Sequence, residues 1–208
     1  MNDLHALFRH SLAGLRTLVL MTLVLGLAYP LAITGIAQVA MPWQANGSLV
    51  DAAGRHVTDP KDAVGSALLG QRTDGRNLFA PRPSAAGAGW DPLNSYGSNY
   101  GPEDPNLIAA VEKRRAAIAR RDGVAPSAVP PDALTASGSG LDPDISRAYA
   151  ELQVPRVAHA NGLTVGEVRR LVDQHTAGRT LGVLGEPRVN VLELNIAVLR
   201  AAGASANG

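Results

Sequence analysis

The sequence contains no cysteine and few aromatic residues. Without cysteine, the 208-residue chain has no disulfides, no thiolate metal ligands and no cysteine nucleophile. Aromatic residues make up 4%, whereas glycine and proline number 22 and 14, a composition typical of many turns between modest elements. The formal net charge of +1 does not indicate the clearly basic face that nucleic acids require, so no nucleic-acid partner is expected.

Motifs that mark common catalytic sites are also missing. The sequence has no phosphate loop ending in Gly-Lys-Ser/Thr, no Asp-Lys-Thr-Gly-Thr phosphorylation segment, no His-Glu-x-x-His and no Gly-x-Ser-x-Gly. His159 and His175 lie far apart and lack the spacing of metal ligands, so no metal site is expected. We therefore predict no catalytic residue, no covalently bound cofactor and no enzymatic activity of the chain by itself.

One long stretch, from Thr17 to Met41, contains no charged side chain. It exceeds the roughly 20 apolar residues that cross a bilayer core, so residues 17–41 are predicted to form a transmembrane helix. Arg9 and Arg16, with two histidines, make the N-terminal flank the more basic one, which places the N-terminus in the cytoplasm. A cleaved signal peptide is the alternative, but its apolar region would be shorter.

This apolar stretch carries a ridge of small and polar residues at every fourth position: Thr22, Gly26, Pro30, Thr34 and Gln38. Pro30 cannot donate a hydrogen bond to the Gly26 carbonyl, so a kink is predicted there. Small and hydroxyl-bearing residues on one ridge are typical of membrane helices that pack together. We therefore favour a helix packed against other membrane helices over an anchor that merely tolerates a proline.

The remaining sequence predicts an α+β fold, a mainly helical mixed α/β domain outside the cytoplasm. Short strands are expected at 48–50, 67–69 and 181–184. Helices are expected over 105–121, 142–160, 164–175 and a last segment that Asn190 caps. Residues 79–105 are expected to be an ordered loop, and Pro155 to bend or divide its helix. The predicted division is a cytoplasmic segment 1–16, the membrane helix 17–41, a periplasmic domain 42–201 and a flexible tail 202–208.

Polar residues of this domain supply candidate contacts. The Ser137-Gly138-Ser139-Gly140 segment could approach a phosphate through its backbone amides, but Asp142 would repel an anion, so a simple turn is favoured. Arg82 and Arg156 each follow a proline; they are expected to pair with Asp104 or Glu151, or to contact a partner chain. The charged residues of the 105–121 helix are expected to be solvated: Glu112, Lys113, Arg114, Arg115, Arg120 and Arg121.

These patterns leave two classes of function open. One is a subunit of a membrane transporter or another assembly, and the other is a free-standing periplasmic enzyme or binding protein, anchored or secreted. The ridge in the membrane helix favours the first class. The lack of a catalytic constellation weakens the second.

Several segments, taken in order, are similar to one family. They are Tyr29-Pro30-Leu31 with Thr34 and Gln38, then 44–49, 65–71, 82–85, 95–99, 129–132, 135–143, Gln153 with Arg156-Val157-Ala158, and 189–195. In this order they resemble the C subunit of the Kdp-type high-affinity potassium-transporting ATPase. The resemblance extends from the membrane helix almost to the C-terminus. Two departures are Asn161, where a basic residue is expected, and an apparent insertion at 56–64.

The resemblance implies a place in a bacterial inner-membrane complex with a channel-like potassium-binding subunit and an ATP-hydrolysing P-type subunit. The C subunit of this family is described as a catalytic chaperone that raises the ATP affinity of the hydrolysing subunit. ATP is cytoplasmic and the domain is predicted on the far side, so indirect coupling is favoured over direct ATP contact. We expect the domain to stabilise the assembly and cover the potassium entrance, with these candidate partner or entrance contacts: Arg82, Asn94, Ser95, Asn99, Ser137, Ser139, Gln153 and Arg156.

Overall fold

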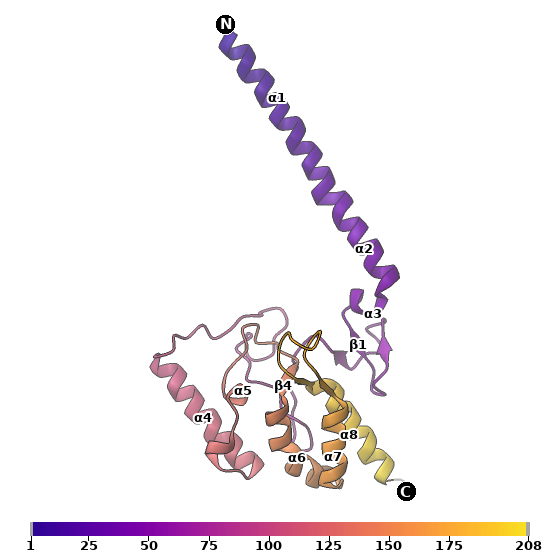
Figure 1. Cartoon of the computed structure of the whole chain (residues 1–208), viewed down its shortest axis with the longest axis vertical. Helices are drawn as coiled ribbons and strands as arrows, with labels where there is room; N and C mark the ends of the chain where they lie inside the picture. Colours follow the sequence, from indigo (N-terminus) through magenta and orange to yellow (C-terminus); the bar gives the residue numbers. More distant parts are fainter. Residues whose placement is uncertain (1, 207–208) are drawn as a thin grey trace. The chain divides into compact units, whose positions relative to one another are not determined.

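The computed structural model describes residues 2–206, which divide into two compact units after Gly47. The first unit is a helical run of α1 (Asn2–Leu23), the π-helical turn η1 (Val24–Ala28) and α2 (Tyr29–Ala40), followed after the non-helical Met41 by the short α3 (Pro42–Ala45) (Figure 1). The most apolar 18-residue window of the stretch Leu4–Ala40 has a mean hydropathy of 2.0, and none of that window is buried within the chain. The helix itself begins at Asn2, before the predicted start of the membrane segment at residue 17, since no proline separates 2–16 from the apolar run.

The helix continues through Pro30 by way of the π-helical turn. The Tyr29 amide donates to the Val24 carbonyl, five residues back, immediately before the proline. A π-turn shifts the hydrogen-bond ladder by one residue, and such turns are an established cause of helix irregularity. The irregularity expected around Gly26 and Pro30 thus takes the form of a π-turn in an otherwise unbroken helix.

The second unit begins with a small antiparallel sheet of order β2-β1-β3. Its strands are β1 (Leu49–Val50), β2 (His56–Val57) and β3 (Gly65–Ser66), so the segment that appeared inserted supplies one strand. The strand expected at 67–69 is wrong. Residues 67–69 turn instead, because the Ser66 hydroxyl accepts a hydrogen bond from the Leu68 amide at 3.1 Å.

A second antiparallel sheet, of order β4-β6-β5, lies with the helices around the core. Its strands are β4 (Asp144–Ser146), β5 (Thr176–Ala177) and β6 (Arg188–Asn190). The helices are α4 (Pro105–Asp122), the 3-10 turn η2 (Pro126–Ala128), α5 (Pro131–Leu134), α6 (Arg147–Asn161), α7 (Val165–Gln174) and α8 (Val191–Ala206). The largest fully buried apolar side chains are Tyr149, Phe79, Leu194, Val50, Val154, Val157, Val168, Val172, Val189 and Val198. A mixed domain in which helix predominates is therefore confirmed.

Two predicted boundaries in this region are wrong. Asp142 does not cap a helix; Ile145 pairs with Val189 in the sheet, and α6 starts later, where the Ser146 hydroxyl accepts from the Tyr149 amide at 3.0 Å. Residues 181–184 form the tip of a hairpin loop instead of a strand, and the strands lie on either side of it. Helix α6 runs through Pro155 without division.

Several helix ends match their sequence signals. Gly162 ends α6 in the left-handed conformation, at a φ of 66°. Thr164 and Glu167 form the predicted capping box, and the Asn190 side chain accepts from the Glu193 amide at 3.2 Å. Helix α8 continues to Ala206, five residues past the predicted end of the domain at 201, because the alanine-rich sequence there favours helix. Residues 207–208 of the predicted tail lie outside the described part of the chain.

Candidate functional site

The centre of the domain is a buried polar cluster around the Asp122 carboxylate, at the end of α4. The Asp122 side chain is completely buried and accepts from Arg121 Nη2 at 2.6 Å and from Arg156 Nε at 2.5 Å. Arg121 also donates to the Tyr149 hydroxyl at 3.2 Å. Arg121 was expected on the solvated face of its helix; the structure turns it inward because Asp122 and Tyr149 supply its partners.

Arg156 links this cluster to an irregular backbone segment at residues 76–80. Its Nη1 donates to the carbonyls of Arg76 and Leu78, and its Nη2 donates to Gln153 Oε1 at 2.8 Å. Burial lowers the pKa of the Arg156 guanidinium, and the hydrogen bond and charge of Asp122 oppose this shift. The positive charge of Arg156 is thus paired with the Asp122 carboxylate inside the protein.

Amide side chains form hydrogen bonds with other backbone groups of the 76–80 segment. Gln153 bonds both backbone groups of Ala80, at 2.8 and 3.2 Å, and Asn195 does the same for Phe79, at 2.7 and 3.0 Å. Asn161 donates to the Asn77 carbonyl at 2.7 Å. We call Asp122, Gln153, Arg156, Asn161 and Asn195 the clamp, because they fix the start of the long loop on helices α4, α6 and α8.

The clamp changes the role of two candidate contacts. Gln153 is 0% exposed and Arg156 8% exposed, so their side chains serve the interior of the domain and not the surface where they were expected. Arg156 pairs with Asp122 instead of Asp104 or Glu151. Asn161, where a basic residue was expected, is one more member of the clamp. Asp122 had no signal in the sequence that would have singled it out, and Asn195 appeared only as the last residue of the family-like segment 189–195.

A second group of contacts joins the loop 79–105 to the Ser137–Gly140 turn. Arg82 Nη1 donates to Asp142 at 2.7 Å, the Ser84 hydroxyl donates to the Gly140 carbonyl at 2.6 Å, and the Ser95 hydroxyl donates to the Ser139 carbonyl at 2.9 Å. The prediction of an ordered loop is confirmed, since its start and middle are both bonded to distant residues. Arg82 pairs internally, with a different acid from the two expected.

The Ser137–Gly140 turn uses its polar groups within the chain. The Ser137 hydroxyl accepts from the Gly140 amide at 2.9 Å, and the Ser139 hydroxyl accepts from the Leu141 amide at 3.0 Å. Asp142 accepts from the Asp144 amide as well as from Arg82. These contacts favour the interpretation as a structural turn over an anion site.

The loop carries a negative charge at the partly exposed Asp91. Asp91 accepts from the Asn94 side-chain amide at 2.6 Å and from the Leu93 amide at 2.9 Å. The hydrogen bond from Asn94, followed by the one from Leu93, lowers the pKa of the Asp91 carboxyl. Asn99 has a positive φ of 53°, a conformation that asparagine tolerates. Of the candidate entrance residues, Asn94 thus contacts this carboxylate directly, and Ser95 instead donates to the Ser139 carbonyl.

Comparison with known proteins shows which family the chain belongs to. The family model described as "KdpC: K+-transporting ATPase, c chain" matches residues 11–200, which include the apolar helix and nearly all of the domain. The chain belongs to the KdpC family. A protein of Kineococcus radiotolerans named "Potassium-transporting ATPase KdpC subunit" is 52% identical over 196 residues, which cover 94% of this chain and 96% of that protein. Proteins of the same name from Gemmatimonas aurantiaca (54% identical, 85% of each chain) and Caulobacter vibrioides (51% identical, 91% of this chain and 92% of that one) are also similar.

For a KdpC chain, the apolar helix is a membrane-packing candidate. A helix of this length and hydropathy near the N-terminus is consistent with a single-pass membrane protein. All five ridge residues, from Thr22 to Gln38, are exposed in the isolated chain. The Gln38 side chain exchanges hydrogen bonds with Asn46 at 3.0 and 3.4 Å, so the polar end of the ridge is tied to the turn that follows the helix.

The domain also has an apolar pocket of about 310 Å³. It is lined mainly by aliphatic residues such as Leu69, Leu192 and Ile196, and the charged Arg72 and Asp74 at its edge pair with each other at 3.0 Å. Small-molecule sites combine apolar walls with a few convergent polar groups. This pocket has the apolar walls but few such polar groups. Within residues 2–206 no group of three or more His, Asp or Glu side chains is placed to hold a metal ion.

Proposed function

We propose that this KdpC chain is the accessory subunit of an ATP-driven potassium-uptake complex in a bacterial inner membrane. The observation that carries the proposal is the family match over residues 11–200, which includes both the apolar helix and the folded domain. Arg9 and Arg16 at the N-terminal end of the helix support a cytoplasmic N-terminus and a periplasmic domain.

The proposed partners are a channel-like potassium-binding subunit and an ATP-hydrolysing P-type subunit. The helix would pack on membrane helices of the complex through the ridge from Thr22 to Gln38, with lipid covering its other faces. We also propose that the chain raises the ATP affinity of the hydrolysing subunit indirectly. The internal bonding of the Ser137–Gly140 turn supports an indirect effect, since both serine hydroxyls and the Gly140 amide are used within the chain. Comparison of half-saturating ATP concentrations for complexes with and without the chain tests this; equal values would contradict it.

The absence of cysteine makes the orientation directly measurable. Ser11→Cys and Ser127→Cys place single thiols at exposed positions on either side of the apolar stretch. In intact spheroplasts a membrane-impermeant maleimide should label only Ser127→Cys, and permeabilised cells should show both. Labelling of Ser11→Cys alone in intact spheroplasts would reverse the proposed orientation.

We further propose that the loop around Asp91 helps to attract potassium to the entrance. The carboxylate is held ionised, and a fixed negative charge at a channel mouth raises the local cation concentration in a salt-dependent way. Asp91→Asn, and the triple change of Asn94, Ser95 and Asn99 to alanine, should each raise the half-saturating potassium concentration, by about two- to fivefold for Asp91→Asn at low ionic strength.

The matched control is Asp62→Asn, which removes an exposed carboxylate from a different loop of the domain. Uptake of potassium or rubidium by cells at low external concentration measures the effect. If Asp91→Asn and the triple alanine variant both leave uptake at the wild-type value, this loop has no role at the entrance.

A further inference from the structure

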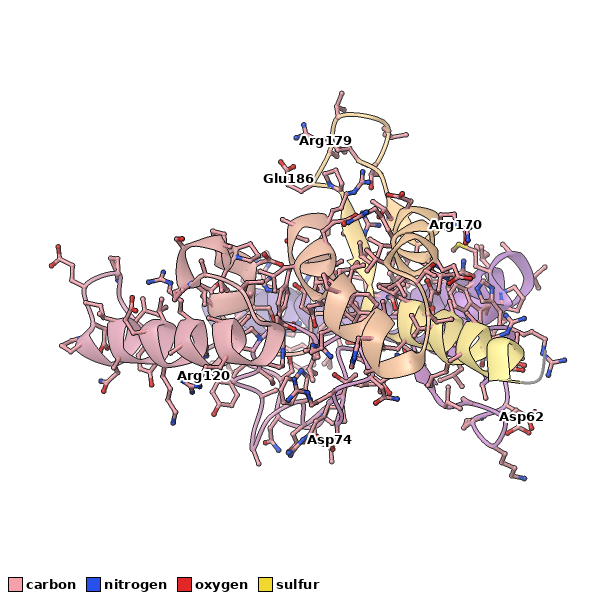
Figure 2. The ribbon with its side chains drawn as sticks, turned by 90° about the horizontal axis from the view of Figure 1, so that it is seen from below. Asp62, Asp74, Arg120, Arg170, Arg179 and Glu186 are labelled. Carbon is pink, nitrogen blue, oxygen red and sulfur yellow. The ribbon has the colours of Figure 1, made fainter. Side chains whose placement is uncertain are left out.

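The loop between β5 and β6 ends in three exposed aliphatic side chains. Leu181, Val183 and Leu184 are 86%, 72% and 58% exposed, and we call them the hairpin tip. Figure 2 shows the loop that carries Arg179 and Glu186 projecting away from the rest of the domain. None of the three side chains belongs to the hydrophobic core. Their exposure therefore has no explanation in the packing of this chain.

The hairpin tip is closed by two backbone hydrogen bonds and includes an unfavourable backbone conformation. The Thr180 amide donates to the Leu184 carbonyl at 2.8 Å, and the Leu184 amide donates back to Thr180 at 2.9 Å. Between them Leu181 has a φ of +55°, in the left-handed region that leucine rarely adopts. Asparagine or glycine would suit this position better. A leucine that is both strained and exposed points to a use of its side chain outside the chain.

The charges beside the hairpin tip are neutralised within the chain. Arg179 bonds both carboxylate oxygens of Glu186, at 3.0 and 3.1 Å, and Arg188 pairs with Asp144 at 3.1 Å. The hairpin tip is therefore an uncharged apolar surface, and the charged residues next to it are paired with each other or with Asp144. Residues 176–190 contain no aromatic residue and no lysine, and both arginines, Arg179 and Arg188, are paired with carboxylates. Segments that anchor a protein at the lipid interface rely on tryptophan, tyrosine and free cationic residues. The hairpin tip lacks these, so a protein pocket is a better binding site for it than a bilayer surface.

The small area of the hairpin tip limits the kind of partner that it can bind. Stable interfaces between free proteins bury about 1,200–2,000 Å², far more than three aliphatic side chains supply. The hairpin tip alone cannot hold two soluble copies together. A chain that shares a membrane and a complex with its partner has a high effective concentration, so a small contact there is useful.

We propose that the hairpin tip docks into an uncharged apolar pocket on another subunit of the same potassium-transporting complex, outside the cytoplasm. The proposal rests on the proposed function, since it requires the assembly and the orientation described above. It assigns a contact surface to residues that local sequence patterns marked only as a short strand. The partner is defined by its chemistry: an apolar pocket on a protein, with no charged residue facing the tip.

The decisive variant is Leu181→Asn, because it is expected to raise the stability of the chain and to lower the recovery of its partner subunits. Asparagine tolerates the left-handed conformation, so the thermal midpoint of unfolding should rise by a few degrees. Loss of the docked side chain should reduce the partner subunits recovered with the tagged chain by about tenfold under dilution. Ile108→Asn is the matched control, since it removes a 56% exposed aliphatic side chain from α4; recovery should then stay at the wild-type level.

Crosslinking identifies what the tip contacts. Leu181→Cys is the only thiol in the chain and can carry a benzophenone maleimide in the assembled complex. The expected product is an adduct with one other subunit. Adducts only with lipid, or only between copies of this chain, would overturn the proposal, as would wild-type recovery for Leu181→Asn. If wild-type chain itself recovers no partners, the proposed function fails instead.

Discussion

Replacing Asp122 by alanine is expected to destabilise the domain by about 3–5 kcal/mol. The Asp122 side chain is fully buried, and its carboxylate compensates Arg156, whose side chain is only 5% exposed. Removing the carboxylate leaves a buried cation without its partner, which costs far more than the loss of a surface ion pair. The 76–80 segment should loosen as well, since Arg156 also holds its carbonyls.

Urea unfolding of the full-length protein in mild detergent, followed by tryptophan fluorescence, measures this effect. The matched control is Asp173→Ala, which removes a 48% exposed carboxylate from its pair with Arg147 and should cost at most about 1 kcal/mol. Equal losses for the two variants would contradict a structural role for the clamp.

Replacing Gly26 by leucine is expected to reduce the recovery of partner subunits by about tenfold, because the ridge would no longer approach a neighbouring helix closely. Within the chain a Cβ at Gly26 would meet only Thr22 Cγ2, at 3.9 Å, so the helix itself tolerates the change. The loss should therefore be one of assembly and leave the fold of the domain intact. Quantification of co-purified subunits, normalised to the tagged chain, measures it.

Gly35→Leu provides the matched control. Gly35 lies on the surface of the same helix but is not one of the ridge positions, and a Cβ there would meet nothing within 4 Å. Lipid should cover this face, so partner recovery should stay near the wild-type level. A loss as large as that of Gly26→Leu would show that the ridge is not the packing face.

The features that the sequence predicted well are local ones. Three helix-end signals depend on residues within four positions of each other. They are the end of α6 at Gly162, the Thr164–Glu167 capping box and the cap at Asn190. The apolar helix follows in the same way from a continuous run of residues. Such signals are complete in a short window, so no knowledge of the tertiary structure is needed to interpret them.

The features that the sequence did not reveal depend on distant partners. Gln153 meets Ala80 across 73 positions, and Asn195 meets Phe79 across 116. Nothing near Gln153 or Arg156 distinguishes a buried clamp from a surface contact. Likewise Ile145 joined a predicted helix because its pairing with Val189 lies far along the chain.

The measurement that tests the central claim most directly is purification of the tagged chain from its native host in a gentle detergent, with identification of the proteins recovered. The account predicts that an ATP-hydrolysing P-type subunit and a large channel-like subunit co-purify with the chain in fixed proportion. Recovery of the chain alone, with its N-terminal helix removed near Ala37, would contradict both the anchor and the complex. A free-standing periplasmic protein would then be the better description.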